Sequence, residues 1–164
     1  MVVKIFYIKE MERDDLNFLK DMLYESLHIP QNKPSKEELL SLPNIKKYYV
    51  DWGRKGDKAL IAYNLEGEKV GAAWYRLFDS ENKGYGYVDS NTPELGLAVK
   101  KVLRGRGLGF LLMRKIIEHA KNDGFKSISL SVDEENSNAI HVYKKLGFKG
   151  YDFDGSSHTM ILII

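Results

Sequence analysis

The sequence predicts a mixed α/β fold, formed as a single domain over residues 1–164. A length of 164 residues fits this prediction, because single domains mostly contain about 100–200 residues. Hydrophobic residues make up 43% of the chain, which is enough to build a core. Short segments of alternating hydrophobicity interleave with segments whose apolar residues recur at helical spacing. Together they predict the element order β-α-α-β-β-β-α-β-α-β-β, with about four helices.

The first part of the chain predicts a strand followed by two helices. Val2–Ile8 alternates enough to form a strand, and Asp14–Leu27 carries leucines at helical spacing. A capping-box pattern begins at Ser35 and predicts a second helix over Lys36–Leu42, because a serine hydroxyl there satisfies a free backbone N–H of the first turn. Pro43 is expected to end that helix.

A hairpin and a long polar loop are predicted next. Lys58–Tyr63 and Val70–Phe78 have the composition of strands, with a glycine-containing turn between them. Asp79–Asn91 is polar and rich in glycine, which predicts a loop. Within this loop, Tyr85–Val88 is expected to form a short extension of a strand.

The second half of the chain alternates strands and helices more regularly. The predicted elements are the strand Glu94–Val99, the helix Gly107–Asp123, the strand Ser127–Val132, the helix Asn136–Leu146 and an antiparallel pair, Lys149–Asp154 with Thr159–Ile164. Each helix carries an apolar stripe that predicts its buried face. The stripes consist of Leu108, Leu111, Leu112 and Ile116 on the first helix and Ala139, Ile140, Tyr143 and Leu146 on the second.

Composition and charge exclude several functional classes. The chain contains 0 Cys, which excludes a disulfide scaffold, a cysteine nucleophile and thiolate metal sites. Its 25 Lys and Arg against 23 Asp and Glu leave a net charge of +2, too small to indicate a nucleic-acid partner. Met1–Glu12 lacks the apolar core of a signal peptide, and no run approaches the ~20 residues of a spanning helix. We therefore expect no nucleic acid and no membrane as partners, and a cytoplasmic location.

The segment Leu97–Gly109, LAVKKVLRGRGLG, carries the strongest chemical signal. A predicted strand ends there in a basic, glycine-rich turn, and a long helix starts. A helix N-terminus leaves about four backbone N–H groups unpaired, and these attract phosphate together with the helix dipole. Glycines at alternate positions let a pyrophosphate approach the backbone, and arginines beside them add charge. The glycines are Gly105, Gly107 and Gly109, and the arginines are Arg104 and Arg106.

Two nucleotide-binding classes do not fit this turn. A Walker A loop requires Lys followed by Ser or Thr at the start of the helix, and neither pair occurs here. A Rossmann fingerprint occupies the first strand-to-helix turn, whereas this turn lies late in the chain, behind antiparallel hairpins. A helix start whose glycines serve only flexibility is the plain alternative.

Two motifs, in order, resemble those of the GCN5-related N-acetyltransferase (GNAT) superfamily. The first is R/Q-x-x-G-x-G/A, the motif that binds the pyrophosphate of acetyl-coenzyme A, matched by Arg104, Gly107 and Gly109. The second, N-x-x-A-x-x-x-Y-x-x-x-G-F, follows in full after the next strand. Its residues here are Asn136, Ala139, Tyr143, Gly147 and Phe148. The resemblance covers about Val70–Ile164 well, and it implies a single N-acetyltransferase domain with a central mixed, mostly antiparallel sheet.

The resemblance also implies how acetyl-coenzyme A is bound. The backbone of Leu97, Ala98 and Val99 is expected to pair with the pantetheine arm as an extra strand. Asn136 is expected to hydrogen-bond the same arm, although Asn is also a preferred helix N-cap. The implied cofactor-binding residues are Leu97, Ala98, Val99, Arg104, Gly105, Arg106, Gly107, Leu108, Gly109, Phe110, Asn136 and Tyr143.

Tyr143 is, by resemblance, the candidate general acid. Transfer of an acetyl group from a thioester to an amine releases a thiolate, and a nearby phenol with a pKa near ~10 can supply its proton. Taken alone, Tyr143 has the pattern of a core residue, because it lies on the apolar stripe of its helix.

Glu94 is the first candidate for the general base. An amine with a pKa near ~10 is mostly protonated at neutral pH and must lose a proton before it attacks. Members of the family often use a carboxylate on the strand before the pyrophosphate turn, sometimes through water. Alternation places Glu94 on one face with Gly96 and Ala98, which predicts space above that face. An exposed carboxylate at a strand start is the alternative, and Asp89 and Asp133 are weaker candidates.

The 4 histidines do not indicate a metal site. None stands with a second histidine or a carboxylate at ligand spacing along the sequence. His119 and His141 share helix faces with lysines and are expected to be solvated, and His28 and His158 lie near breaks between elements. We therefore predict no metal cofactor.

These residues predict an acetyl-coenzyme A-dependent N-acetyltransferase. With no Cys to form an acyl-enzyme, the acetyl group is expected to move directly to a primary amine. The alternative is a catalytically silent module of the same fold that binds acyl-coenzyme A as a sensor. The resemblance places acceptor choice in Leu27–Trp52, whose mixed composition leaves the acceptor, a small molecule or a peptide, open. A homodimer is also left open.

Overall fold

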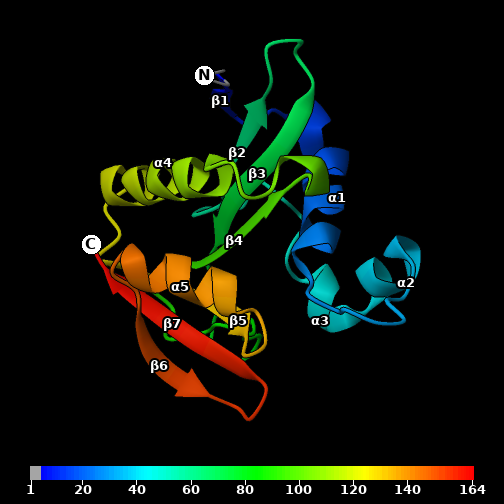
Figure 1. The fold of residues 1–164 in the computed structure, drawn as a ribbon. Coiled ribbons are helices and arrows are strands. Elements are labelled where there is room, and N and C mark those ends of the chain that lie inside the picture. Colours follow the sequence, from blue (N-terminus) through cyan, green and yellow to red (C-terminus); the bar gives the residue numbers. More distant parts are fainter. Residues whose placement is uncertain (1–4) are drawn as a thin grey trace.

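The computed structural model describes residues 5–164 and shows one open sheet with helices on both faces (Figure 1). None of the helices in this part of the chain has both the length and the apolar composition that a membrane span requires. The strands are β1 (Tyr7–Glu10), β2 (Lys58–Tyr63), β3 (Lys69–Arg76), β4 (Glu94–Val99), β5 (Ser127–Asp133), β6 (Lys149–Phe153) and β7 (Ser157–Ile163). The helices are α1 (Leu16–Ser26), α2 (Lys36–Ser41), α3 (Pro43–Lys46), α4 (Leu108–Asn122) and α5 (Ser137–Lys145), with short 3₁₀ turns at Arg13–Asp15 and Lys101–Leu103.

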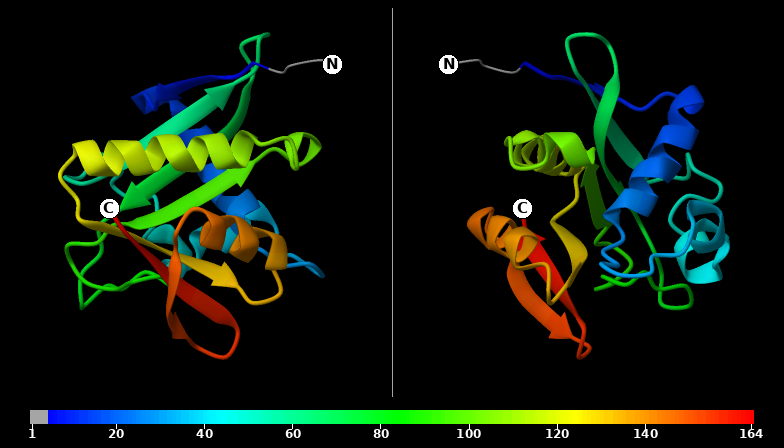
Figure 2. Two further views of the ribbon diagram at one scale, coloured as in Figure 1. Left: turned by 60° about the vertical axis from the view of Figure 1, so that its left-hand side comes forward. Right: turned by 45° about the vertical axis from the view of Figure 1, so that its right-hand side comes forward.

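The strands lie in the order β1-β2-β3-β4-β5-β7-β6, and all neighbours are antiparallel except β4 and β5. β3 and β4 are paired along their length, from Arg76 opposite Glu94 to Gly71 opposite Val99. Within the described residues, β4 and β5 share only the registered pair Glu94 and Ser129, and then diverge (Figure 2, left). The sheet therefore opens into a wedge whose apex lies at Glu94.

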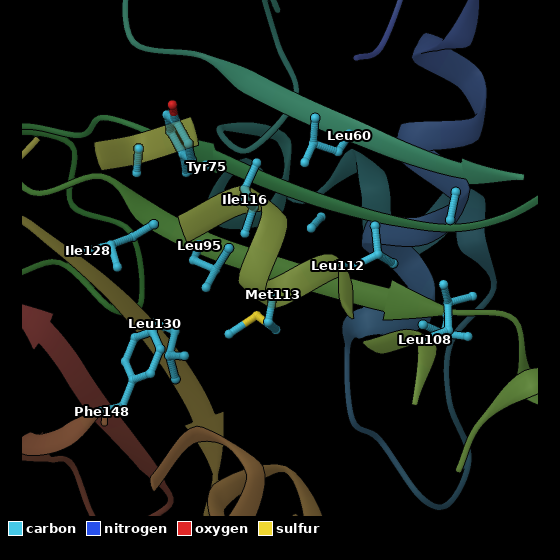
Figure 3. Close-up of a cluster of buried hydrophobic side chains, with 14 of the residues drawn as sticks. Leu60, Tyr75, Leu95, Leu108, Leu112, Met113, Ile116, Ile128, Leu130 and Phe148 are labelled. Carbon is cyan, nitrogen blue, oxygen red and sulfur yellow. The ribbon is translucent and has the colours of Figure 1, made fainter. Parts of the chain in front are cut away.

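Helices α4 and α5 cover one face of the sheet. Figure 3 shows the core under α4, where this helix packs against β2, β3 and β4. Leu111, predicted to be buried, is 37% exposed because it lies at the flank of the stripe that meets the sheet. The residues that α4 buries are Leu108, Leu112, Met113, Ile116 and Ala120. Helix α5 packs the four residues of its predicted stripe against the same core, each of them partly buried.

Helices α1, α2 and α3 cover the opposite face. Helix α1 packs on β4 and β3, so each face of the sheet has its own core. The alternation predicted for β4 is confirmed, because Leu95 and Val99 lie in the core under α4 and Ala98 lies in the core under α1. The second core contains Leu19, Met22, Leu23, Leu40, Ile45, Ile61, Ala72 and Trp74.

The buried side chain of Arg76 fastens the segment after α3 to the end of β3. Its guanidinium donates to both carboxylate oxygens of Asp57 at 2.8 Å. It also donates to the backbone carbonyls of Lys47 at 2.9 Å and Val50 at 2.6 Å. A planar guanidinium bound by this many acceptors allows little freedom of orientation. The turn that carries Tyr48 is therefore held in place beside β4.

Three sequence predictions about the elements differ from the structure. The strand predicted at Val2–Ile8 is observed at Tyr7–Glu10, and residues 2–4 of that prediction lie outside the described residues. Pro43 does not simply end a helix but starts α3, since proline suits the first helical position, where an N–H is not needed. Tyr85–Val88 forms no strand, because its backbone is bound to side chains of the site described below.

Candidate active site

The wedge between β4 and β5 exposes one edge of β4. Leu97, Ala98 and Val99 pair with β3 on one side, and among residues 5–164 no strand pairs with them on the other. Unpaired N–H and C=O groups at a strand edge can pair with an extended ligand. The structure thus gives these three residues the free edge that an extended cofactor arm needs.

The glycine-rich turn presents unpaired N–H groups at the start of α4. The first N–H to form a helical hydrogen bond is that of Leu111, which donates to the carbonyl of Gly107 at 3.1 Å. In the described part of the chain, the N–H groups of Gly105–Phe110 have no acceptor. Gly105 and Gly107 have φ values of 78° and 83°, which favour glycine. A Cβ added to either would meet nothing within 4 Å, so the space before the turn is open to an anion.

The surroundings of Gly109 differ from those of Gly105 and Gly107. A Cβ added there would lie 3.7 Å from Leu97 Cδ2 and 3.9 Å from Val99 Cγ2. These atoms belong to β4 beneath the helix, not to the space before the turn. A Cβ at position 109 would thus make only ordinary van der Waals contacts with β4, and the N–H of Gly109 stays among the unpaired groups.

Arg104 and Arg106 place positive charge beside the turn. Arg104 Nε donates to the carbonyl of Val99 at 3.2 Å, and its guanidinium forms a 3.4 Å ion pair with Glu25 of α1. Arg106 is exposed and forms no ion pair within residues 5–164. Both side chains favour binding of an anion here, although solvent screening limits the binding energy that exposed charges contribute.

Asn136 occupies the N-cap position of α5, as its residue type suggests. Its side chain nevertheless accepts no capping hydrogen bond from the helix. The residue is half-buried in the turn after β5, where its backbone N–H donates to the carbonyl of Asp133 at 3.0 Å. Within residues 5–164 the side-chain amide has no hydrogen-bond partner, so it is free to bind a ligand.

Tyr143 has its ring in the core and its hydroxyl free of hydrogen bonds within the described residues. Its ring packs against the core under α4 and α5, with a centroid distance of 5.9 Å to Phe148. The hydroxyl has no hydrogen-bond partner among the described residues. Burial raises the pKa of Tyr143 to about 12, so the phenol keeps its proton at neutral pH.

Glu94 is not an exposed carboxylate, because its side chain lies buried at the apex of the wedge. Its Oε2 accepts a hydrogen bond from the Tyr48 hydroxyl at 2.6 Å, and its Oε1 accepts one from the N–H of Gly86 at 2.8 Å. Burial raises the pKa of Glu94 to about 7, against the two hydrogen bonds and the charge of Lys47, which favour ionisation. Both protonation states are accessible near neutral pH, as a general base requires.

The space predicted above Gly96 is filled by an aromatic ring. Gly96 lies directly opposite Trp74 of β3. A Cβ added to Gly96 would overlap the indole ring. The glycine therefore makes room for Trp74, and the space predicted above it is not open.

Sequence reasoning missed the partners of Glu94. Tyr48 lies in the turn after α3, and its hydroxyl also accepts the N–H of Tyr85 at 2.7 Å. A Cβ added to Gly84 would overlap both this hydroxyl and Glu94 Oε1. The closely spaced glycines at 84 and 86 were the available signal, but nothing in their spacing points to a residue as distant in sequence as Tyr48.

The weaker candidates for the base do not share the burial of Glu94. Asp89 accepts the N–H of Asn91 at 2.8 Å within a turn. Asp133 lies with Glu135 and His28, and their potential ligand atoms are all within 4.8 Å of one another. Spacing along the chain does not indicate this cluster, because His28 follows α1, whereas Asp133 ends β5 and Glu135 follows it. The fold brings this histidine and the two carboxylates together in space, which spacing along the sequence does not show.

Comparison with known proteins finds similarity over most of the chain. The model of the acetyltransferase (GNAT) family matches residues 20–148. The probable N-acetyltransferase san of Drosophila melanogaster is 35% identical over 107 residues, covering 65% of this chain and 54% of that protein. The mycothiol acetyltransferase of Gordonia bronchialis is 34% identical over 101 residues, covering 53% of this chain and 33% of that protein. The chain therefore matches only part of the length of these relatives.

Solved structures share the fold over nearly the whole chain. A putative acetyltransferase from Acinetobacter baylyi aligns with a TM-score of 0.72 and 20% identity, covering 100% of this chain and 94% of that one. A putative acetyltransferase from Salmonella typhimurium, solved with its cofactor acetyl-CoA, aligns with a TM-score of 0.70 and 18% identity. The alignment covers 97% of this chain and 94% of that one. At these identities the likeness concerns the fold.

Proposed function

Because the chain belongs to the acetyltransferase (GNAT) family, we propose that it is an acetyl-coenzyme A-dependent N-acetyltransferase. The wedge between β4 and β5 carries the proposal, because it joins three features that acetyl transfer needs. These are a free strand edge, a helix N-terminus with unpaired N–H groups, and a buried carboxyl with a pKa near neutral pH.

The cofactor lies along the open edge of β4 in this proposal. Its pantetheine arm pairs with Leu97–Val99, and the amide of Asn136 contacts the arm from the side of β5. The pyrophosphate accepts hydrogen bonds from the N–H groups of Gly105–Phe110 and meets the charges of Arg104 and Arg106. The thioester then reaches the apex of the wedge, beside Glu94.

Glu94 is the general base in the proposed reaction. It takes a proton, directly or through water, from the ammonium form of a primary amine. The neutral amine nitrogen attacks the thioester carbonyl carbon, so that a C–N bond forms and the C–S bond breaks. The proton that the nitrogen still carries after the attack then leaves it and, directly or through water, restores the proton that Tyr143 gives to the thiolate. The chain has 0 Cys, so the transfer is written as direct, with no acyl-enzyme.

Tyr143 is the general acid for the leaving thiolate. Its hydroxyl has no partner within residues 5–164, and its high pKa keeps the proton in place until the C–S bond breaks. Tyr143 packs with the core under α4, whereas the partner of Glu94, Tyr48, packs with the core under α1. The proposed acid and base thus belong to opposite faces of the sheet, and each serves its own proton transfer.

An acceptor screen with acetyl-coenzyme A tests the proposal. Purified protein is mixed with aminoglycosides, polyamines, amino acids and peptides, and free thiol is followed over time. We expect one amine class to release thiol in proportion to acetylated product, and Glu94→Gln and Tyr143→Phe to slow that release. Tight binding of coenzyme A with no transfer to any amine would instead identify a sensor module.

A further inference from the structure

We propose that Tyr48 is a positioning residue for acetyl transfer, whose hydroxyl orients the Glu94 carboxylate and fastens the loop Gly84–Tyr87 beside it. The inference rests on the proposed function, in which Glu94 accepts the proton of the amine. Tyr48 lies outside both sequence motifs, so nothing in the resemblance assigns it this role.

The Tyr48 hydroxyl stands at the centre of a chain of hydrogen bonds. It donates to Glu94 Oε2 at 2.6 Å and accepts the N–H of Tyr85 at 2.7 Å. The second carboxylate oxygen accepts the N–H of Gly86 at 2.8 Å, and the carbonyl of Gly86 accepts the Ser129 hydroxyl at 2.6 Å. The chain therefore connects the turn after α3, the loop before β4 and strand β5 around one carboxylate.

Close packing fixes the position of the Tyr48 ring. The ring meets Phe78 edge-on at a centroid distance of 5.0 Å and stacks on Tyr85 at 6.3 Å. Gly84 has no room for a Cβ beside the hydroxyl and Glu94. The surroundings therefore hold the hydroxyl on the carboxylate, so the hydrogen bond does not depend on a mobile side chain.

No other side chain replaces this donor. Lys47 favours the ionised form of Glu94 by its charge, but its ammonium donates to the backbone carbonyl of Lys83 at 2.7 Å. Arg76 lies opposite Glu94 on β3, and its guanidinium is bound to Asp57. Ser129 lies opposite on β5 and is neutral. Among the described residues, Tyr48 is thus the side chain that donates a hydrogen bond to the Glu94 carboxylate.

Loss of the hydroxyl has a defined consequence for the base. A hydrogen bond that favours the ionised carboxylate lowers its pKa, so removing the bond raises the pKa of Glu94 above about 7. Hydrogen bonds to charged groups correspond to about 1–2 pH units. At neutral pH the ionised fraction of Glu94 then falls from about a half to about a tenth or less.

The pH dependence of kcat/KM in Tyr48→Phe tests the inference. The substitution keeps the ring and removes the hydroxyl, and we expect the acidic limb of the profile to move to higher pH by about 1–2 units. Tyr49→Phe is the matched control, because its hydroxyl donates to the carbonyl of Leu40 at 2.6 Å and does not contact Glu94. The limb of this control is expected to match that of the wild type.

Two measurements without turnover support the kinetic result. Titration of the Glu94 carboxyl by carbon NMR, assigned with Glu94→Gln, is expected to show the same upward shift in Tyr48→Phe. Amide exchange at Tyr85 and Gly86 is expected to quicken in Tyr48→Phe and to stay unchanged in Tyr49→Phe, because the loop loses one of its acceptors.

The outcomes separate the inference from the proposed function. If the acidic limb persists in Glu94→Gln, Glu94 is not the base, and the mechanism proposed above fails. If the limb disappears in Glu94→Gln but Tyr48→Phe titrates as the wild type in both kinetics and NMR, only the positioning role of Tyr48 is overturned.

Discussion

The substitution Gly107→Val is the sharpest test of an anion site at the start of α4. Gly107 has a φ of 83°, and an added Cβ meets nothing within 4 Å, so the change introduces backbone strain without a clash. A non-glycine residue in this region costs about 1–2 kcal/mol, somewhat more when it is β-branched. Domains are typically stable by about 5–15 kcal/mol, and the variant is therefore expected to stay folded.

Coenzyme A binding is expected to fall much further than stability. The valine side chain projects into the space before the unpaired N–H groups of residues 105–110, where the pyrophosphate lies in the proposed complex. Losing about two charge-assisted hydrogen bonds, each contributing about 1.5–3 kcal/mol, predicts a loss of affinity of about 100-fold or more.

Isothermal titration with coenzyme A measures this effect, and Gly67→Val supplies the control. Gly67 lies in the turn between β2 and β3 with the same φ of 83°, and a Cβ there also meets nothing within 4 Å. The two variants therefore carry similar strain, but only one lies at the turn before α4. A folded Gly107→Val protein that binds coenzyme A as tightly as Gly67→Val would refute the placement of the pyrophosphate.

Four further predictions follow from the same geometry. Tyr143→Phe is expected to lower kcat about 100-fold and to leave the melting temperature unchanged, because the hydroxyl has no partner within residues 5–164; a full rate would make Tyr143 a packing residue. Glu94→Gln is expected to slow the reaction chiefly at low pH, and a pH–rate profile equal to that of the wild type would remove Glu94 from the mechanism. Arg104→Ala is expected to weaken coenzyme A binding in the same titration less than Gly107→Val does, because its side chain is 50% exposed. Finally, the pKa of Glu94 in the folded protein is about 7, above its ordinary 4.5. As the pH rises from 4.5 through 7, the free energy of unfolding of the wild type is therefore expected to fall by about 3 kcal/mol relative to that of Glu94→Gln. Urea unfolding checks this, and a difference independent of pH contradicts it.

Local sequence patterns predict most of the fold. The strands Lys58–Tyr63 and Glu94–Val99 begin and end at the predicted residues. A glycine-containing turn marks the end of the first strand, and alternation marks the second. Helix α3 was missed because it has only 4 residues, too few for a periodic pattern. It depends instead on Pro43 at its start and on burial of Ile45 in the core under α1.

The candidate site was predictable only where it is continuous in sequence. The turn before α4 and the second motif each lie within one segment, so spacing alone marks them. The contact between Tyr48 and Glu94 forms when the helices after β1 fold onto the sheet, and no periodicity records such a contact. Trp74 above Gly96 is a similar case, since the register of β3 and β4 decides which ring fills the space.

The break in pairing between β4 and β5 accounts for both halves of the candidate site. If the strands were paired throughout, the edge of β4 would have no free N–H and C=O groups for a ligand. The same break makes Glu94 and Ser129 the last registered pair, where the loop before β4 and the turn after α3 cover the carboxyl. That burial raises the pKa of Glu94, while the hydrogen bonds from Tyr48 and Gly86 keep it at about 7. A carboxyl in water would have its ordinary pKa of 4.5 and be a weaker base. The location of Glu94 at the apex therefore gives it the basicity that the proposed reaction uses.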